Sequence, residues 1–267
     1  LSKTFETFGT IRKSKIKYKD IALFKSNKII DNIDILNLDN LNKLLESLKP
    51  NIIVNCIGVT KRKISDNLLD VIKINSIFPH ELVKWGLINS ARIIHFSTDC
   101  VFNGLTGNYN EKSNTNAFDI YGKTKALGEI QYDNCLTIRS SFIGRELFDK
   151  TELLEWVISN NGKKIKGFKK TMYSGVSALF LSKFIKNIIN DHIKLNGLFQ
   201  LSTDIPISKY DLICLIRDCF DLNIEIIPEN NKYHCPTLDN SKLKNKMNFE
   251  IPSWKEMLVE LKNNKIN

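Results

Sequence analysis

Short apolar runs alternate with segments of helical periodicity along the first half of the chain. Strands are expected over residues 5–11, 51–57, 93–97 and 135–139. Apolar residues recur at helical spacing over residues 41–48, 65–87 and 120–131. Within the long helical segment, Pro79 predicts a kink or a second helix start. Strands that alternate with helices predict an α/β fold with a doubly wound parallel sheet, whose ligands bind at the carboxyl ends of the strands.

The alternation of strands and helices changes after Ser140. Helices are expected over residues 153–159, 176–190 and 210–220, with short strands at residues 198–201 and 224–227. We therefore predict a larger sheet domain over residues 1–141 and a smaller mixed lobe over residues 142–267. The boundary is soft, because no linker rich in proline or glycine separates the two parts.

Polar residues end one of the predicted strands, and a tyrosine and a lysine follow on a helix. Ser97, Thr98 and Asp99 end one strand, and Tyr121 and Lys125 share one helix face, one turn apart. A cation beside a phenol lowers the pKa of the phenol. Among 7 tyrosines in a lysine-rich chain, about one such spacing is expected by chance. The spacing therefore becomes informative only beside the strand-end hydroxyls. Together, the hydroxyls, the phenol and the ammonium predict carbonyl reduction.

Composition narrows the class of protein without adding chemistry. The chain has 267 residues, 42% of them hydrophobic, which suffices for a full core. Neither a run of about 18 apolar residues nor a signal peptide is visible, so we expect a cytoplasmic protein. The net charge of +10 comes from lysines spread along the whole chain, which favours a solvated surface over a nucleic-acid site. The 6 cysteines lack disulfide or zinc-ligand spacing, so reduced thiols and no metal are expected.

Three ordered motifs carry a family resemblance. Residues 96–104 (FSTDCVFNG), 121–129 (YGKTKALGE) and 139–141 (RSS) closely resemble the extended short-chain dehydrogenase/reductase superfamily, and within it the dTDP-4-dehydrorhamnose reductase family. The resemblance covers nearly the whole chain. It implies a Rossmann-type NAD(P)-binding domain over residues 1–141, a substrate-binding lobe over residues 142–267, and NADPH-dependent reduction of a 4-keto nucleotide sugar in deoxysugar or surface polysaccharide synthesis. The implied partners are the nucleotide sugar and a second copy of the chain, with neither nucleic acid nor membrane.

The resemblance also assigns roles to residues. It implies that Tyr121 is the general acid, that Lys125 lowers the pKa of Tyr121 and binds the nicotinamide ribose, and that Thr98 donates a hydrogen bond to the oxyanion. Arg12 matches the basic residue that favours a 2′-phosphate, so NADPH is expected rather than NADH; a solvated arginine is the alternative. The other implied cofactor contacts are Asp34, Ile35, Asn55, Cys56, Gly58 and Ser97.

The chain departs from the rhamnose-type pattern in the substrate pocket. Phe142-Ile143-Gly144 stands where a tryptophan is usual, and residues 171–176 (TMYSGV) replace a Gln-x-Gly-x-Pro-Thr segment. This pattern looks closer to reductases of other deoxy or amino sugars. Asp99, Arg145, Tyr173 and Ser174 are the predicted substrate contacts; a cap or loop role is the alternative for Asp99, and an ordinary loop position for the other three.

The glycine-rich phosphate loop of the family should lie about 20 residues before the acceptor strand. The sequence begins at Leu1, already near that strand, so we expect that residues precede Leu1 in the complete protein. A natural deletion is the alternative, and it would weaken dinucleotide binding. Two other functions stay open: a nucleotide-sugar epimerase or dehydratase with bound NAD, and a non-catalytic subunit, as the regulatory subunit of methionine adenosyltransferase resembles this family.

Overall fold

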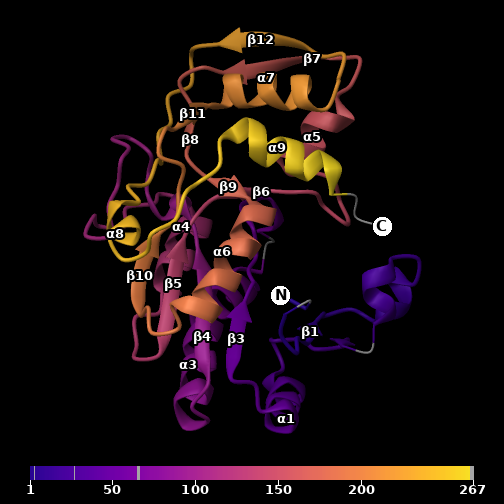
Figure 1. Ribbon diagram of the computed structural model, residues 1–267, viewed down its shortest axis with the longest axis vertical. Coiled ribbons are helices and arrows are strands. Elements are labelled where there is room, and N and C mark those ends of the chain that lie inside the picture. The colour runs from indigo at the N-terminus through magenta and orange to yellow at the C-terminus, as the bar shows by residue number, and fades with distance from the viewer. Residues whose placement is uncertain (3, 27, 65–66, 265–267) are drawn as a thin grey trace.

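A four-stranded parallel sheet lies at the centre of the chain (Figure 1). The computed structural model describes residues 1–2, 4–26, 28–64 and 67–264. In the sheet, neighbouring strands follow the order β10-β5-β4-β3, and all pairs are parallel. Their bounds are β3 Ile52–Asn55, β4 Arg92–Ser97, β5 Cys135–Arg139 and β10 Gly197–Gln200. The predicted parallel α/β architecture is confirmed.

Helices cover both faces of this sheet because its strands are apolar on both sides. Ile93 and its neighbour Ile94 belong to different core clusters, as successive strand residues point to opposite faces. Ile94 packs in the cluster that holds Leu181 and Ile185 of α6 (Ala178–Asp191). On the other face, Ile93 packs in the cluster formed with α1 (Leu38–Leu48) and α3 (Phe78–Ile88).

The second half of the chain returns to the sheet before it completes the smaller lobe. Helix α6 leads into β10, and β10 pairs with β5 along four residues. Both elements lie after the predicted boundary at Ser141, so the sheet includes a segment that the sequence placed in the lobe. The physical reason is that β10 is a fourth apolar strand, with Leu198 and Phe199 buried. The division into residues 1–141 and 142–267 stays a prediction.

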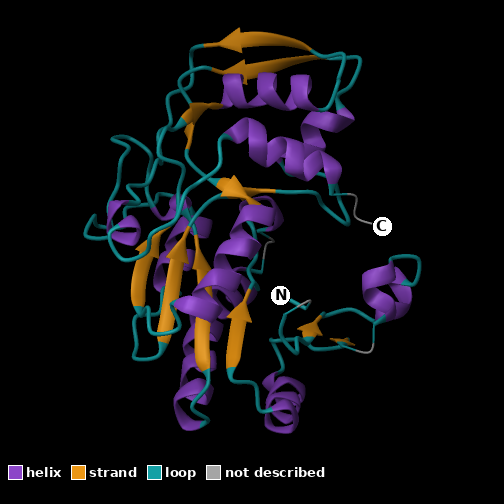
Figure 2. Cartoon of the chain, viewed as in Figure 1, coloured by secondary structure: helices purple, strands orange, loops and turns teal. Residues whose placement is uncertain are grey.

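The smaller lobe lies beyond the carboxyl ends of the sheet strands (Figures 1 and 2). Its strands form three separate pairs, of which β8 with β11 is antiparallel and the other two are parallel. Serine or acidic side chains cap several helices here, such as the capping box of Ser253 and Glu256 in α9. The elements are β6 Phe142–Ile143, α5 Leu153–Ser159, β7 Lys164–Phe168, β8 Met172–Tyr173, β9 Val176–Ser177, β11 Ile207–Ser208, α7 Lys209–Cys219, β12 Glu225–Glu229, α8 Ser241–Lys244 and α9 Trp254–Asn263.

The N-terminal residues form a small sheet of their own. Strands β1 (Gly9–Thr10) and β2 (Ile29–Ile30) pair in parallel, apart from the four-stranded sheet (Figure 2). The strand expected over residues 5–11 is therefore limited to two residues. Short strands of this kind gain few ladder hydrogen bonds, and Phe8 beside β1 is exposed.

The long helical segment contains a π-helical turn at Lys73–Ile77, between α2 (Leu68–Ile72) and α3. Pro79 lies in the first turn of α3, a position that favours proline, so the predicted second helix start is confirmed. Ser65, at which the segment was expected to begin, lies outside the described residues. Helix α4 (Ile120–Leu127) ends four residues before the predicted Gln131 because Gly128 caps it. Among the described residues, we find no helix that is both long and apolar enough to cross a membrane.

Candidate active site

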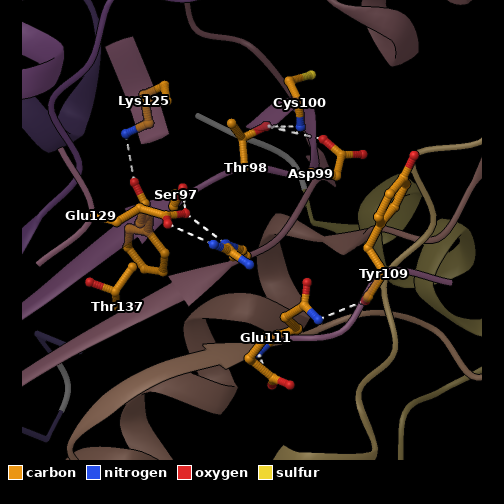
Figure 3. A network of polar contacts seen from close by, with 12 residues as sticks. Ser97, Thr98, Asp99, Cys100, Tyr109, Glu111, Lys125, Glu129 and Thr137 are labelled. Atoms are coloured by element: carbon orange, nitrogen blue, oxygen red, sulfur yellow. Dashed lines mark hydrogen bonds and ion pairs between the residues drawn. The ribbon is translucent and has the colours of Figure 1, made fainter. Parts of the chain in front are cut away.

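The carboxyl end of β4 meets helix α4 at Thr98 and Tyr121. Thr98 caps a short turn, since its hydroxyl accepts from the Cys100 N–H at 3.1 Å and donates to Asp99 Oδ1 at 3.0 Å (Figure 3). Gly122 allows α4 to approach this turn: a Cβ there would lie 2.2 Å from the Cys100 carbonyl oxygen. The close approach requires glycine directly after Tyr121, and the Tyr121 phenol lies near the Thr98 hydroxyl.

Lys125 is buried, and its ammonium donates a hydrogen bond to the Phe96 carbonyl oxygen at 2.7 Å (Figure 3). Burial lowers the pKa of Lys125 to about 8, because desolvation disfavours the charged form. Glu129 acts in the opposite direction, since its negative charge raises that pKa. The charge of Lys125 is therefore sensitive to its surroundings near neutral pH.

The pKa of Tyr121 departs from the prediction. Burial raises it above the ordinary value, and the Cys100 and Asp99 charges act in the same direction, while Thr98 lowers it. Lys125, which was expected to lower it, donates a hydrogen bond to the Phe96 carbonyl. Tyr121 is consequently held as a neutral phenol, the protonation state that a general acid requires.

A buried ion pair lies behind these residues and was not anticipated from the sequence. Glu129 accepts from Arg139 Nε and Nη2, both at 2.7 Å, and from the Ser97 hydroxyl at 2.6 Å (Figure 3). The Arg139 guanidinium also lies 5.0 Å from the centre of the Phe102 ring. Both charged residues belong to the motifs that carry the family resemblance. The only signal in the sequence was an acidic residue, Glu129, after α4 and a basic residue, Arg139, at the end of β5.

A cavity of about 400 Å³ opens beside Tyr121 and Lys125. Five of the predicted cofactor residues line it together with Tyr121, namely Asn55, Cys56, Gly58, Ser97 and Lys125. Its apolar wall comes from β3, from Phe142 and from Leu181 and Ile185 of α6. The presence of α6 here could not be predicted from the sequence, because a helix of the second half comes beside the cavity only through the order of the sheet strands.

Two asparagines hold the backbone that borders the cavity. Asn55 Oδ1 accepts from the Ile57 N–H at 3.0 Å, and Asn55 Nδ2 lies 3.0 Å from His95 Nδ1. Asn75, in the π-helical turn, accepts from the Val59 N–H at 2.8 Å and donates to the Val59 carbonyl at 3.1 Å. These bonds fix the loop after β3, which leaves the exposed edge of that loop available to a ligand.

The other predicted cofactor residues lie outside the residues that line the cavity. Arg12 is exposed after β1. Asp34 Oδ1 accepts from the Leu36 N–H at 3.0 Å, within its own turn before α1. Ile35 packs against the core cluster formed by α1 and α3. Their roles towards a cofactor stay predictions.

Lys209 and His234, from segments far away in the sequence, lie near Asp99. Burial raises the pKa of Asp99, whereas hydrogen bonds from Thr98 and Cys100 and the charges of Lys209 and His234 lower it. Lys209 is the first residue of α7, and burial lowers its pKa, while Asp99 raises it. His234 follows β12 and contacts Gly104, where a Cβ would lie 2.4 Å from its Nδ1. Sequence reasoning missed Lys209 and His234 because only the fold brings them near Asp99.

The remaining predicted substrate residues make structural contacts. Arg145 Nε donates to the buried Glu155 carboxylate. Tyr173 is buried in the main core cluster, 5.6 Å from the Trp254 ring, and its hydroxyl has no hydrogen-bond partner among the described residues. Ser174 accepts from the Leu238 N–H at 3.1 Å and is also buried. Tyr173 belongs to strand β8 rather than to a loop. Contact of these three residues with substrate stays a prediction.

Residues 10–266 match the family described as RmlD substrate binding domain. Among curated proteins, methionine adenosyltransferase 2 subunit beta from Xenopus tropicalis is 23% identical over 210 residues, which cover 71% of this chain and 60% of that protein. A dTDP-4-dehydrorhamnose reductase from Aggregatibacter actinomycetemcomitans is 27% identical over 199 residues, 70% of this chain and 67% of the relative. The aligned part of the chain thus spans less than two thirds of the length of the adenosyltransferase subunit.

A solved structure extends the likeness to the fold. The crystal structure of dTDP-4-dehydrorhamnose reductase from Bacillus anthracis in complex with NADP superposes with a TM-score of 0.78, at 19% identity, and covers 96% of this chain and 97% of that chain. At this identity the superposition establishes the fold.

Proposed function

The chain belongs to the RmlD substrate binding domain family, and from this we propose that it reduces the keto group of a 4-keto nucleotide sugar with NADPH. One observation carries the proposal: Thr98, Tyr121 and Lys125 lie together at one end of the sheet, and two of them line the 400 Å³ cavity. Parallel sheets bind ligands at this edge.

The cavity residues fit a nicotinamide cofactor. An ammonium can donate three hydrogen bonds, and Lys125 gives one to Phe96, which leaves two for ribose hydroxyls. Tyr121 and the apolar side chains of Phe142, Leu181 and Ile185 offer a surface for the ring. NADPH, when bound, would supply the hydride. Arg12 is proposed to contact a 2′-phosphate, so Arg12→Ala should raise KM for NADPH and leave KM for NADH unchanged, with Lys19→Ala as a matched surface control.

The chain's own residues would handle the proton and the charge. The neutral Tyr121 phenol gives its proton to the sugar carbonyl oxygen as the carbonyl is reduced to a hydroxyl. Positioned proton transfer of this kind increases the reaction rate by about 10²–10⁴-fold. Thr98 donates a hydrogen bond to the same oxygen while negative charge develops. Lys125 stabilises the phenolate that Tyr121 leaves, since a nearby cation favours the anion.

The function is tested by the loss of NADPH absorbance with dTDP- and UDP-linked 4-keto sugars. We expect turnover with at least one of them, and its loss in Tyr121→Phe. No turnover with any of these sugars would contradict the proposal. NAD that stays bound through purification, without net oxidation of NADPH, would favour the epimerase or dehydratase. We also propose cytoplasmic localisation and a homodimer, which cell fractionation and light scattering would check.

A second candidate rests on the relatives named as methionine adenosyltransferase 2 subunit beta. It would be a non-catalytic subunit that binds a methionine adenosyltransferase. Purified chain and a catalytic adenosyltransferase subunit, mixed and separated by size-exclusion chromatography, should then elute as one complex. A complex that forms equally with Tyr121→Phe, together with no sugar reduction, would favour this candidate over the reductase.

A further inference from the structure

The Glu129 carboxylate joins three elements of the site. It follows α4, accepts from the Ser97 hydroxyl at the end of β4, and accepts two hydrogen bonds from Arg139 at the end of β5 (Figure 3). Ser97 directly precedes Thr98, and Lys125 lies four residues before Glu129. One carboxylate thus connects the strand end that carries Thr98 with the helix that carries Tyr121 and Lys125.

The position of Glu129 is fixed by a close backbone approach. A Cβ at Gly128 would lie 1.9 Å from the Asn75 carbonyl oxygen, so no other residue fits there without movement. Pro79, four residues after Asn75, has no N–H to offer this carbonyl. The π-helical turn and the end of α4 are consequently in direct contact, and Glu129 leaves that contact towards the sheet.

Burial makes this ion pair costly to build. The side chains of Arg139 and Glu129 are 4% and 6% exposed. Two desolvated charges repay their loss of hydration only when further hydrogen bonds satisfy them, and apolar residues of similar size are often as stable. A pair of this kind beside Lys125 indicates a role in the site rather than a gain in stability.

We propose that Glu129 is a positioning residue, which holds the Ser97–Thr98 strand end against α4 and keeps the Lys125 ammonium protonated. The inference rests on the proposed reductase function, because a protonated Lys125 is needed there to stabilise the Tyr121 phenolate.

Apart from Glu129 and the Arg139 guanidinium paired with it, the titratable groups around Lys125 are neutral. Burial lowers the pKa of His95, on β4, well below its ordinary value, and the Lys125 charge lowers it further. Burial raises the pKa of Cys56, at the exit of β3, and that of Tyr121, on α4. Glu129 is the one group that raises the pKa of Lys125 among the described residues.

The test measures the titration of Lys125 in the full chain. The ¹³Cε resonance of Lys125, assigned by its loss in Lys125→Arg, should titrate with a midpoint of about 8. In Glu129→Gln the midpoint should fall by about one pH unit, because an adjacent opposite charge is removed. Glu129→Asp keeps the charge, so its midpoint should stay near that of the wild type. Glu155→Gln, which removes a carboxylate equally buried beside Arg145, is the matched control and should leave the midpoint unchanged.

Glu129→Gln leaves Arg139 buried without its partner, so the double variant Glu129→Gln/Arg139→Gln is measured beside it. An unchanged midpoint in the variants that fold would overturn the role of Glu129. In activity, the fall of kcat at alkaline pH should move to lower pH by the same amount, which a purely structural role would not cause. Absence of turnover by the wild type would count against the reductase function, and the Lys125 titration would still decide the role of Glu129.

Discussion

The ammonium of Lys125 donates its hydrogen bond to the backbone carbonyl of Phe96, and the two atoms lie 2.7 Å apart. Phe96 precedes Ser97 and Thr98 at the end of β4. This bond therefore ties helix α4 to the strand end that carries the Thr98 hydroxyl. The bond also places the positive charge beside the cavity, where Gly58 and Tyr121 lie.

Tyr121→Phe should remove the proton donor and little else. The phenol is neutral and adjoins a cavity, so its loss should lower kcat by about 10²–10⁴-fold, while the melting temperature changes little. NADPH oxidation with a 4-keto nucleotide sugar measures the first effect and calorimetry the second. Tyr132→Phe, at a tyrosine that is 48% exposed and bonded to His80, is the matched control. Equal losses in both variants would contradict the role of Tyr121.

Lys125→Met should make the protein more stable at neutral pH. Burial lowers the pKa of Lys125 from 10.5 to about 8, so between these values the unfolded chain binds more protons than the folded one. The contribution of this group to stability is thus unfavourable below pH 8 and improves as pH rises to 10.5. Removing the charge should raise the free energy of unfolding at pH 7 by on the order of 2 kcal/mol, once the lost hydrogen bond to Phe96 is subtracted.

The gain from Lys125→Met should shrink between pH 8 and pH 10. Urea denaturation at several pH values measures this difference. Lys123→Met, at an exposed position of the same helix, should show no pH-dependent gain. A Lys125→Met protein that is less stable than the wild type at pH 7 would contradict the prediction.

Lys209→Met should weaken binding of the sugar nucleotide. Lys209 is partly desolvated, and its charge interacts with Asp99. An anionic substrate beside Asp99 would be attracted by this charge. KM for the nucleotide sugar should rise on the order of tenfold, with KM for NADPH unchanged. Lys164→Met, whose lysine pairs with Glu225 at the surface, is the control. A rise in both KM values would instead indicate that Lys209 contacts the cofactor or supports the fold in general.

Tyr173→Phe separates packing from substrate contact. The Tyr173 hydroxyl is buried without a partner among the described residues, so its removal should raise the free energy of unfolding by about 1 kcal/mol. The ring would still pack on Trp254. We expect kcat/KM to stay close to the wild-type value in the assay used for Tyr121→Phe. A large increase in KM for the sugar would instead support Tyr173 as a substrate contact.

Much of the sheet could be predicted because its strands are continuous apolar runs. Cys135–Arg139 was predicted to the residue, and Arg92–Ser97 differs by one residue at its start. The N-terminal strand was predicted too long, since alternation over residues 5–11 does not supply a pairing partner. The place of β10 in the sheet could not be predicted, because strand order depends on contacts between residues far apart in sequence.

The sequence by itself determined the fold class and the three groups proposed for the chemistry, Thr98, Tyr121 and Lys125. Spacing alone was not enough, because about one such Tyr-Lys pair is expected by chance; the strand-end hydroxyl and the family resemblance singled out these residues. Only the tertiary structure decided what surrounds them: the Phe96 carbonyl that accepts from Lys125, the buried pair of Glu129 and Arg139, and Lys209 and His234 near Asp99. Burial and long-range charge set the pKa values, and neither can be read from spacing along the chain.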